Sequence, residues 1–328
     1  RDSVASRGLG DVYKRQYSEL GGFGQNPHGN FPCGGSSAGS AIAVAAGFCD
    51  AALGTETRGS LMIPGFRNGV YSFKPTRGFV SRNGIVPLSS SFDAPGVLAR
   101  NPALLKEVFL SMIGVDPADD QSFELRSKES KPSRKRIIIC VSRSLGEMGL
   151  LQTKLRSFFT QLKLNGLEFF FIDLPEITFD YKTISSTDIR SDMTKFLQRY
   201  GYDKEPGSFE ELVERYRERP HAHFYGMERL EEALVMPQIS KSVLKKLVNE
   251  NVAKARDLIN SILDCYDADF VGFLNFVDWF SIGGGPSCTL PVSFETKPPI
   301  SIMLGSRVGN DLALLDIVQE FSEIAKSV

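Results

Sequence analysis

Histidine and paired cysteine, on which many catalytic and metal centres depend, are scarce in this sequence. Histidine occurs at only three of 328 positions, His28, His221 and His223. No carboxylate or cysteine stands at zinc-binding spacing near the last two, which are interpreted as a loop or surface pair. The five cysteines are scattered without a C-x-x-C spacing. The sequence therefore predicts no metal site, no disulfide framework, and reduced thiols in a cytoplasmic protein.

An excess of charge and long apolar runs are also missing. The chain has 38 basic and 39 acidic residues and a formal net charge of -1, so it has no overall attraction for nucleic acid or anionic lipid. The basic run at residues 126–136 is interpreted as a solvated loop. The apolar runs at residues 41–48 and 137–141 are far shorter than the roughly 20 residues that cross a bilayer. A P-loop motif is absent as well, which excludes that kind of nucleotide site. We expect neither nucleic acid nor membrane as a partner.

Apolar periodicity indicates an α/β protein. Residues 137–141 are apolar and mostly β-branched, residues 150–164 have a helical pattern, and residues 168–172 read as a second strand. This order predicts a parallel strand–helix–strand unit. Further helices are expected at residues 40–47, 102–115, 208–219, 226–235, 239–263 and 311–326, and further strands at 270–273 and 300–304. Ser208 and Glu211 form an expected capping box.

Two segments rich in serine and glycine are the main candidates for a catalytic site. GGSSAGS at residues 34–40 opens a small-residue helix, and GTETRGS at residues 54–60 follows that helix. Glycine lets the backbone approach a ligand closely. The second segment can direct several successive N–H groups at one point, as stabilisation of a tetrahedral oxyanion requires. GGG at residues 283–285 could form an anion-binding backbone nest, but we favour a tight turn.

The residues from 34 to 100 resemble the amidase signature family. GGSSAGSAIAVAAG and the stretch from ALGTETRGS to DAPGVLAR carry the likeness, and SIGGGPSCTLPVSF at residues 281–294 adds to it. The G-T-E-T variant resembles the branch with peptide amidases and amidotransferase A-like proteins. The resemblance implies an amidase signature fold, with a central mixed β-sheet flanked by helices, and hydrolysis of an amide carbon–nitrogen bond without a cofactor.

The same resemblance implies a Ser-cisSer-Lys triad. Ser60 corresponds to the nucleophile and Ser36 to the bridging serine, which follows a cis peptide bond in the family. The backbone amides of Thr57, Arg58, Gly59 and Ser60 correspond to the oxyanion hole. A serine hydroxyl needs a neighbouring group to take its proton, and the second serine can relay that proton to a neutral lysine.

The lysine of this triad has no counterpart among these residues. In the family it lies upstream of the bridging serine, where only Lys14 stands here. Lys74 belongs to a downstream K-P-T pattern and is interpreted as structural. We interpret residues 1–16 as a non-native leader and residues 17–328 as one amidase-signature domain that lacks its N-terminal part. This chain is therefore expected to be nearly inactive.

The substrate side of the site is predicted by family analogy in residues 176–250, a mostly helical region. Phe196, Tyr200 and Phe224 are candidates for contacts with a small amide substrate. Arg58 either points into the acyl pocket, where it would favour an acidic substrate, or faces away.

Two alternative functions remain open. One is a catalytically inactive, amidase-like binding or scaffold protein. The other is an esterase of the α/β-hydrolase type, in which GSSAG at residues 35–39 forms a nucleophile elbow, Ser37 attacks, and His221 or His223 is the base. This elbow should follow a strand, but the preceding HGNFPC is polar and broken by proline.

Overall fold

The computed structural model describes residues 17–18, 22–124, 135–142, 149, 155–201, 206–219, 227–293 and 296–325. His221, His223, Phe224 and Lys14 lie outside these residues, and so do the interpreted leader and most of the basic run. Within the described part, no helix is both long and apolar enough to cross a membrane.

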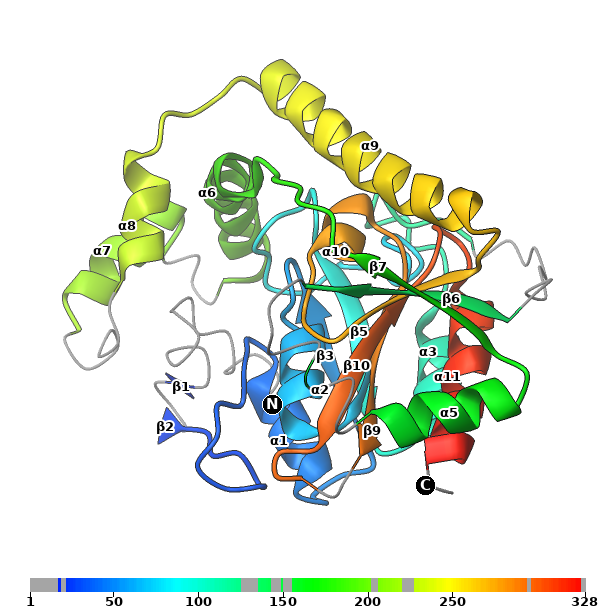
Figure 1. The fold of residues 1–328 in the computed structure, drawn as a ribbon. Helices are drawn as coiled ribbons and strands as arrows, with labels where there is room; N and C mark the ends of the chain where they lie inside the picture. The colour runs from blue at the N-terminus through cyan, green and yellow to red at the C-terminus, as the bar shows by residue number, and fades with distance from the viewer. Residues whose placement is uncertain are drawn as a thin grey trace.

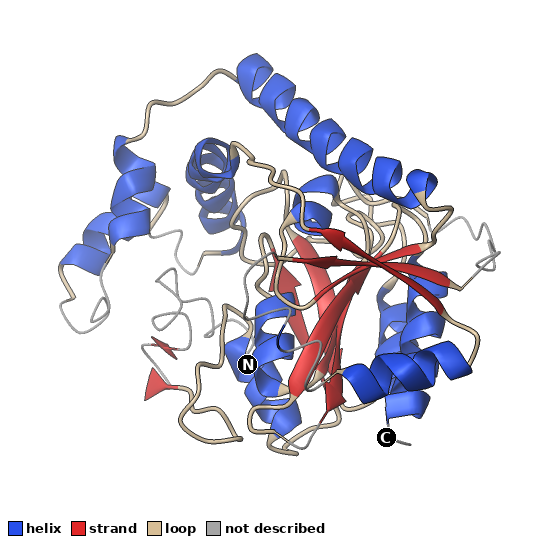
Figure 2. Cartoon of the chain, viewed as in Figure 1, coloured by secondary structure: helices blue, strands red, loops and turns tan. Residues whose placement is uncertain are grey.

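A mixed sheet of eight strands forms the centre of the fold (Figures 1 and 2). From one edge to the other it contains β3 (Ala51–Glu56), β5 (Ala94–Ala99), β4 (Tyr71–Lys74), β9 (Ser287–Ser293), β10 (Ile300–Gly305), β8 (Phe270–Phe273), β6 (Arg136–Val141) and β7 (Glu168–Asp173). The β8–β6 and β6–β7 pairs are parallel and the other neighbours are antiparallel. This arrangement confirms the predicted α/β class with a central mixed sheet.

Helices cover both faces of the sheet, because its central strands are apolar on both sides (Figure 2). In β6, Ile137 and Ile139 point into one core layer and Ile138 into the other, as the two-residue period of a strand requires. The first layer contains α3 (Pro102–Met112), α5 (Arg156–Leu164) and α11 (Asp311–Ala325). The second contains α1 (Ala38–Ala45), the end of α9 (Lys241–Cys265) and α10 (Trp279–Gly283). The short helix α2 (Met62–Asn68) enters the second layer through Met62.

A group of helices stands beside the sheet and has an apolar cluster of its own (Figure 1). It contains α6 (Tyr181–Tyr200), α7 (Phe209–Arg217) and α8 (Glu228–Val235). Ser208 caps α7 as predicted, since its hydroxyl accepts a hydrogen bond from the Glu211 N–H at 3.1 Å. The Glu211 carboxylate accepts from the Gly207 N–H at 2.7 Å, one residue earlier than the expected capping box.

The predicted strand–helix–strand unit is present as β6, α5 and β7, with β6 and β7 parallel. The strands expected at 270–273 and 300–304 are β8 and β10, and the terminal helix is α11. A short antiparallel pair, β1 (Tyr17–Ser18) and β2 (Gly22–Phe23), completes the described strands.

Candidate active site

The two serine-bearing segments meet because α1 packs against β3. Ser37, at the start of α1, donates its hydroxyl to the Thr55 carbonyl at 3.2 Å and accepts from the Thr55 N–H at the same distance. The Ser40 hydroxyl donates to the Leu53 carbonyl at 2.7 Å. In the loop that follows β3, the Ser60 carbonyl accepts from the Ser37 N–H at 3.1 Å. These bonds hold the segment around Ser36 beside the one around Ser60.

Ser36 and Ser60 are both partly exposed. Neither hydroxyl makes a hydrogen bond to any residue that the structure describes. A cis peptide bond joins Gly35 to Ser36, which agrees with the expectation from the family resemblance. Both hydroxyls are therefore available to a substrate or to another catalytic group.

The loop between β3 and α2 presents a set of unused N–H groups. Gly59 has a φ of +93°, a conformation that turns the chain and that side chains rarely adopt. A Cβ at this position would stand 2.7 Å from the Phe276 ring, so both its conformation and its packing require glycine. Within the described residues, the backbone N–H groups of Arg58, Gly59 and Ser60 have no hydrogen-bond acceptor. Such a loop can bind the oxygen of a carbonyl that is becoming an oxyanion.

The buried carboxylate of Glu56 fixes the position of this loop. Its Oε2 accepts from the N–H groups of Leu61 and Met62, both at 2.9 Å, and its Oε1 accepts from the Ser281 hydroxyl at 2.6 Å. The side chain is fully buried. Glu56 therefore engages the two N–H groups that follow Ser60 and leaves the earlier ones available.

A second carboxylate, that of Asp93, holds the loop from the other side. Its Oδ1 accepts a short hydrogen bond from the Thr57 hydroxyl, and its Oδ2 accepts from the N–H groups of Leu88 and Ser89 at 2.8 and 3.0 Å. Both Thr57 and Asp93 are buried. The segment of residues 81–93 is thereby linked directly to the loop that carries Ser60.

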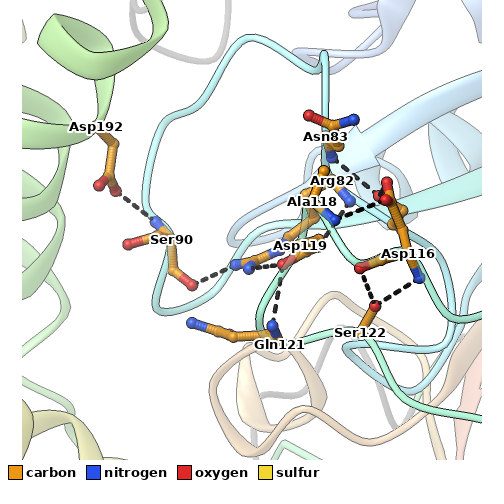
Figure 3. A network of polar contacts seen from close by, with 10 residues as sticks. Arg82, Asn83, Ser90, Asp116, Ala118, Asp119, Gln121, Ser122 and Asp192 are labelled. Carbon is orange, nitrogen blue, oxygen red and sulfur yellow. Dashed lines mark hydrogen bonds and ion pairs between the residues drawn. The ribbon is translucent and has the colours of Figure 1, made fainter.

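The segment of residues 81–93 is itself fixed by a polar network (Figure 3). Arg82 binds Asp119 through two nitrogens, at 3.0 and 2.5 Å, and donates to the Ser90 carbonyl at 2.5 Å. Asp192 of α6 accepts from the Ser90 N–H at 2.8 Å, and Asp188 accepts from the Ser89 hydroxyl at 2.5 Å. Hydrogen bonds from Arg82 hold the pKa of Asp119 at about 2, although burial opposes this shift. Thus α6 and the 116–122 loop both stabilise this wall of the site.

Arg58 extends from the candidate oxyanion loop toward a cavity of about 780 Å³. Its Nε donates to Asp278 at 2.7 Å, and its guanidinium lies 4.8 Å from the centre of the Tyr181 ring. The cavity is lined by Arg58, Ser142, Phe276 and residues 173–178 and 277–279. Asp278 neutralises the charge of Arg58, which weakens the expectation that this arginine selects an acidic substrate.

Two of the predicted substrate contacts, Phe196 and Tyr200, lie outside the lining of this cavity. Phe196 and Tyr200 of α6 pack against each other with ring centres 5.1 Å apart, and the Tyr200 hydroxyl donates to the Asn83 side chain at 2.5 Å. Neither lines the cavity beside Arg58. Their role in substrate binding stays a prediction, as does that of Phe224, which lies outside the described residues.

Ser37 and Lys74, the competing candidates for nucleophile and base, both make hydrogen bonds within the fold. The Ser37 side chain is buried and hydrogen-bonded to β3, and no strand leads into it among the described residues 24–37. Both features differ from a nucleophile elbow. Lys74 is also buried, and its Nζ donates to the carbonyls of Gly285 at 2.6 Å and Pro75 at 3.0 Å. This geometry agrees with the structural role expected for Lys74.

Two solved structures with a similar fold are amidase proteins. The peptide amidase from Stenotrophomonas maltophilia superimposes with a TM-score of 0.85 over 98% of this chain and 72% of that chain, at 23% identity. An amidase family protein from Bacillus anthracis gives a TM-score of 0.84 over 95% of this chain and 65% of that chain, also at 23% identity. These similarities confirm the amidase signature fold.

The family model described as Amidase matches residues 16–272, and the chain belongs to this family. The glutamyl-tRNA(Gln) amidotransferase A subunit from Rickettsia bellii is 34% identical over 195 residues, which cover 55% of this chain and 40% of the relative. Its mitochondrial counterpart from Aedes aegypti is 47% identical over 91 residues, which cover 28% and 18%. The chain thus spans less than half the length of these curated relatives.

Sequence reasoning did not find three carboxylates at this site. Glu56 lies inside the GTETRGS motif, where its position directly before Thr57 is the only local signal. Asp93 and Asp278 lie in other segments, and only the tertiary fold brings them to the loop.

Proposed function

We propose that this protein hydrolyses an amide bond with Ser60 as the nucleophile. The observation that carries the proposal is the loop before Ser60, whose N–H groups at residues 58–60 are unused among the described residues while Glu56 and Asp93 hold it from both sides. The fold and family of the chain support the same reaction.

The proposed reaction begins when Ser60 Oγ attacks the amide carbonyl carbon. Its proton passes through the Ser36 hydroxyl to a general base, and the carbonyl oxygen becomes an oxyanion that accepts from the N–H groups of residues 57–60. The carbon–nitrogen bond then breaks, and the leaving nitrogen takes up the proton as ammonia or an amine. Water then attacks the acyl-enzyme and gives its proton to the base. A proton returns through Ser36 to the Ser60 oxygen as the acid is released.

We propose that the general base is a lysine supplied from outside these 328 residues. The family resemblance places this lysine upstream of the bridging serine, and Lys74 is occupied by two backbone carbonyls. The 328-residue chain should then hydrolyse amides slowly, because a positioned base contributes on the order of a hundred- to ten-thousand-fold in rate.

The cavity beside Arg58 suggests which amides fit. Its described lining contains the carboxylate of Glu176 together with Arg58 and Asp278, which are paired with each other. A negatively charged substituent would meet net repulsion there. We therefore propose a small amide substrate with a neutral or cationic substituent on the side that faces this cavity.

A fluorophosphonate probe followed by peptide mass spectrometry tests the nucleophile. Label on Ser60 is expected, and Ser60→Ala should abolish both the label and the release of ammonia or amine from simple aliphatic and peptide amides. Ser37→Ala is the matched control and should keep the label at Ser60. Label on Ser37 would favour the esterase alternative. Absence of label in a longer gene product that carries the upstream lysine would favour the inactive binding protein.

The base is tested by comparing that longer product with the 328-residue chain. The longer product should release amine at least about a hundred-fold faster. Equal rates would contradict the proposed lysine and return attention to Lys74.

A further inference from the structure

Two arginines from distant parts of the sequence converge on the C-terminal end of α10. Arg77, which follows β4, donates through Nη1 to the carbonyls of Ser281 and Ile282, both at 3.4 Å. Arg256 of α9 donates through Nε to the Gly283 carbonyl at 2.7 Å. Positive charge at this end of a helix is favourable, so capping explains part of the arrangement.

Capping leaves most of the donors of these two groups unused. A guanidinium has five N–H donors, and the Nη2 atoms of Arg77 and Arg256 have no hydrogen-bond acceptor among the residues that the structure describes. No carboxylate of the described ranges lies within ion-pair distance of either side chain. Two cations therefore stand close together without a direct counter-charge.

The surroundings of Arg77 favour a bound anion. Burial, together with the positive charges of Arg256 and Arg82, lowers the pKa of Arg77 to about 10, and Asp93 offsets this only in part. Burial also lowers the pKa of Arg256. A cation that is partly removed from water and surrounded by other cations is costly unless an anion accompanies it.

Gly284 lets the two guanidinium groups lie close together. A Cβ at residue 284 would lie 3.1 Å from Nη2 of Arg77 and 3.5 Å from Nη2 of Arg256, so both nitrogens lie next to this glycine and close to each other. Gly284 has a φ of +77° at the end of α10, which favours glycine there. Any other side chain would crowd the Arg77 guanidinium, whose Cζ would lie 3.2 Å from its Cβ.

The site is held in place and open to solvent. The Arg77 guanidinium lies 5.7 Å from the centre of the Phe92 ring, and Phe92 stacks on Tyr181 at 6.0 Å. Arg256 is an exposed residue on α9, which gives a small ligand access from outside.

We propose that Arg77 and Arg256 together bind an oxyanion, the carboxylate or phosphate group of a small molecule, beside Gly284. Two neighbouring guanidinium groups with unused N–H donors match the paired oxygens of either group. This site is separate from Ser60. Ser281 stands between the two, because its carbonyl accepts from Arg77 while its hydroxyl donates to Glu56. The proposal does not depend on amide hydrolysis.

Calorimetric titration of the intact chain with inorganic phosphate, pyrophosphate and succinate, each at constant ionic strength, tests this site. We expect saturable binding of one anion per chain for at least one of the three. Arg77→Gln and Arg256→Gln should each weaken it about 10- to 100-fold, as loss of charge-assisted hydrogen bonds predicts. Arg307→Gln is the matched control, because it removes the same charge from a surface pair with Asp264.

Each outcome decides the proposal. Preference for phosphate and pyrophosphate would assign a phosphorylated ligand, and preference for succinate a carboxylate. If no anion saturates the protein, or if Arg256→Gln binds as the unchanged chain does, the proposal is overturned. An equal loss in Arg307→Gln would show general attraction of anions and would overturn it as well. Because Arg256 is exposed, its variant decides the result even if Arg77→Gln does not fold.

Discussion

The buried Glu56 carboxylate offers the sharpest test of how the candidate oxyanion loop is held. It accepts three hydrogen bonds, from the N–H groups of Leu61 and Met62 and from the Ser281 hydroxyl, in a fully buried position. Glu56→Ala leaves three buried donors without an acceptor. At about 1 to 3 kcal/mol for each, the free energy of unfolding should fall by about 3 kcal/mol or more.

Glu56→Gln separates the shape of this side chain from its charge. The glutamine carbonyl oxygen can accept from both N–H groups, and its amide can donate to the Ser281 oxygen, so only charge assistance is lost. We expect a loss of about 1 to 2 kcal/mol, roughly half of the loss in Glu56→Ala or less. Ser281→Ala, which keeps both N–H bonds, should cost about 1 kcal/mol.

Urea denaturation of the three variants measures these differences, and kinetics on the catalytically complete protein measures the role of Glu56 in positioning. Glu56→Ala should lower kcat by about a hundred-fold with little change in KM, because donors that are misplaced by a loosened loop stabilise the transition state less. If Glu56→Ala and Glu56→Gln were equally stable, within about 0.5 kcal/mol, the unsatisfied-donor argument would be wrong.

Three further predictions concern stability, and denaturant unfolding tests each. Burial lowers the pKa of Lys74 from 10.5 to about 8 in the folded protein. Between these two pH values the unfolded chain binds more protons than the folded one, so the free energy of unfolding should rise with pH by up to about 3 kcal/mol. Lys74→Met should remove this rise. If the free energy of unfolding rose as much between about pH 7 and about pH 10 in Lys74→Met as in the unchanged chain, the prediction would be contradicted. Arg82→Lys should cost roughly 1 to 3 kcal/mol, since an ammonium cannot reproduce the two-nitrogen contact with Asp119, and a loss below about 0.5 kcal/mol would speak against that contact. Ser208→Ala should cost about 1 kcal/mol through loss of the N-cap of α7, whereas Ser208→Gly should cost only a few tenths, and equal losses would count against capping.

The elements that could be predicted from sequence are those with a local signal. β6 and α11 have strong apolar patterns, and Ser208 marks the start of α7. By contrast, β5 has the sequence APGVLA, in which proline and glycine argue against a central strand. It forms because β3 and β4 pair with it on its two sides and because it is buried throughout. This stabilisation is tertiary, so a reading of neighbouring residues cannot find it.

The residues of the candidate site also differ in whether the sequence could predict them. Ser36 and Ser60 were predicted because both lie in motifs that resemble a known family. Apart from Glu56, the residues that hold them lie far away in the sequence, as Asp278 lies far from Arg58. Only the fold identifies which of them face the loop.

The glycine segment at residues 283–285 shows why a local pattern can leave two interpretations open. As a sequence it fits a tight turn or an anion-binding nest, and the turn is the favoured interpretation. In the structure Gly284 does end a helix in a left-handed conformation, as a turn requires. Yet Arg77, which follows β4, and Arg256 of α9 both place a guanidinium nitrogen next to Gly284. The chemistry of the segment thus depends on residues that no local pattern includes, and the glycine at the turn lets the two guanidinium groups lie close together.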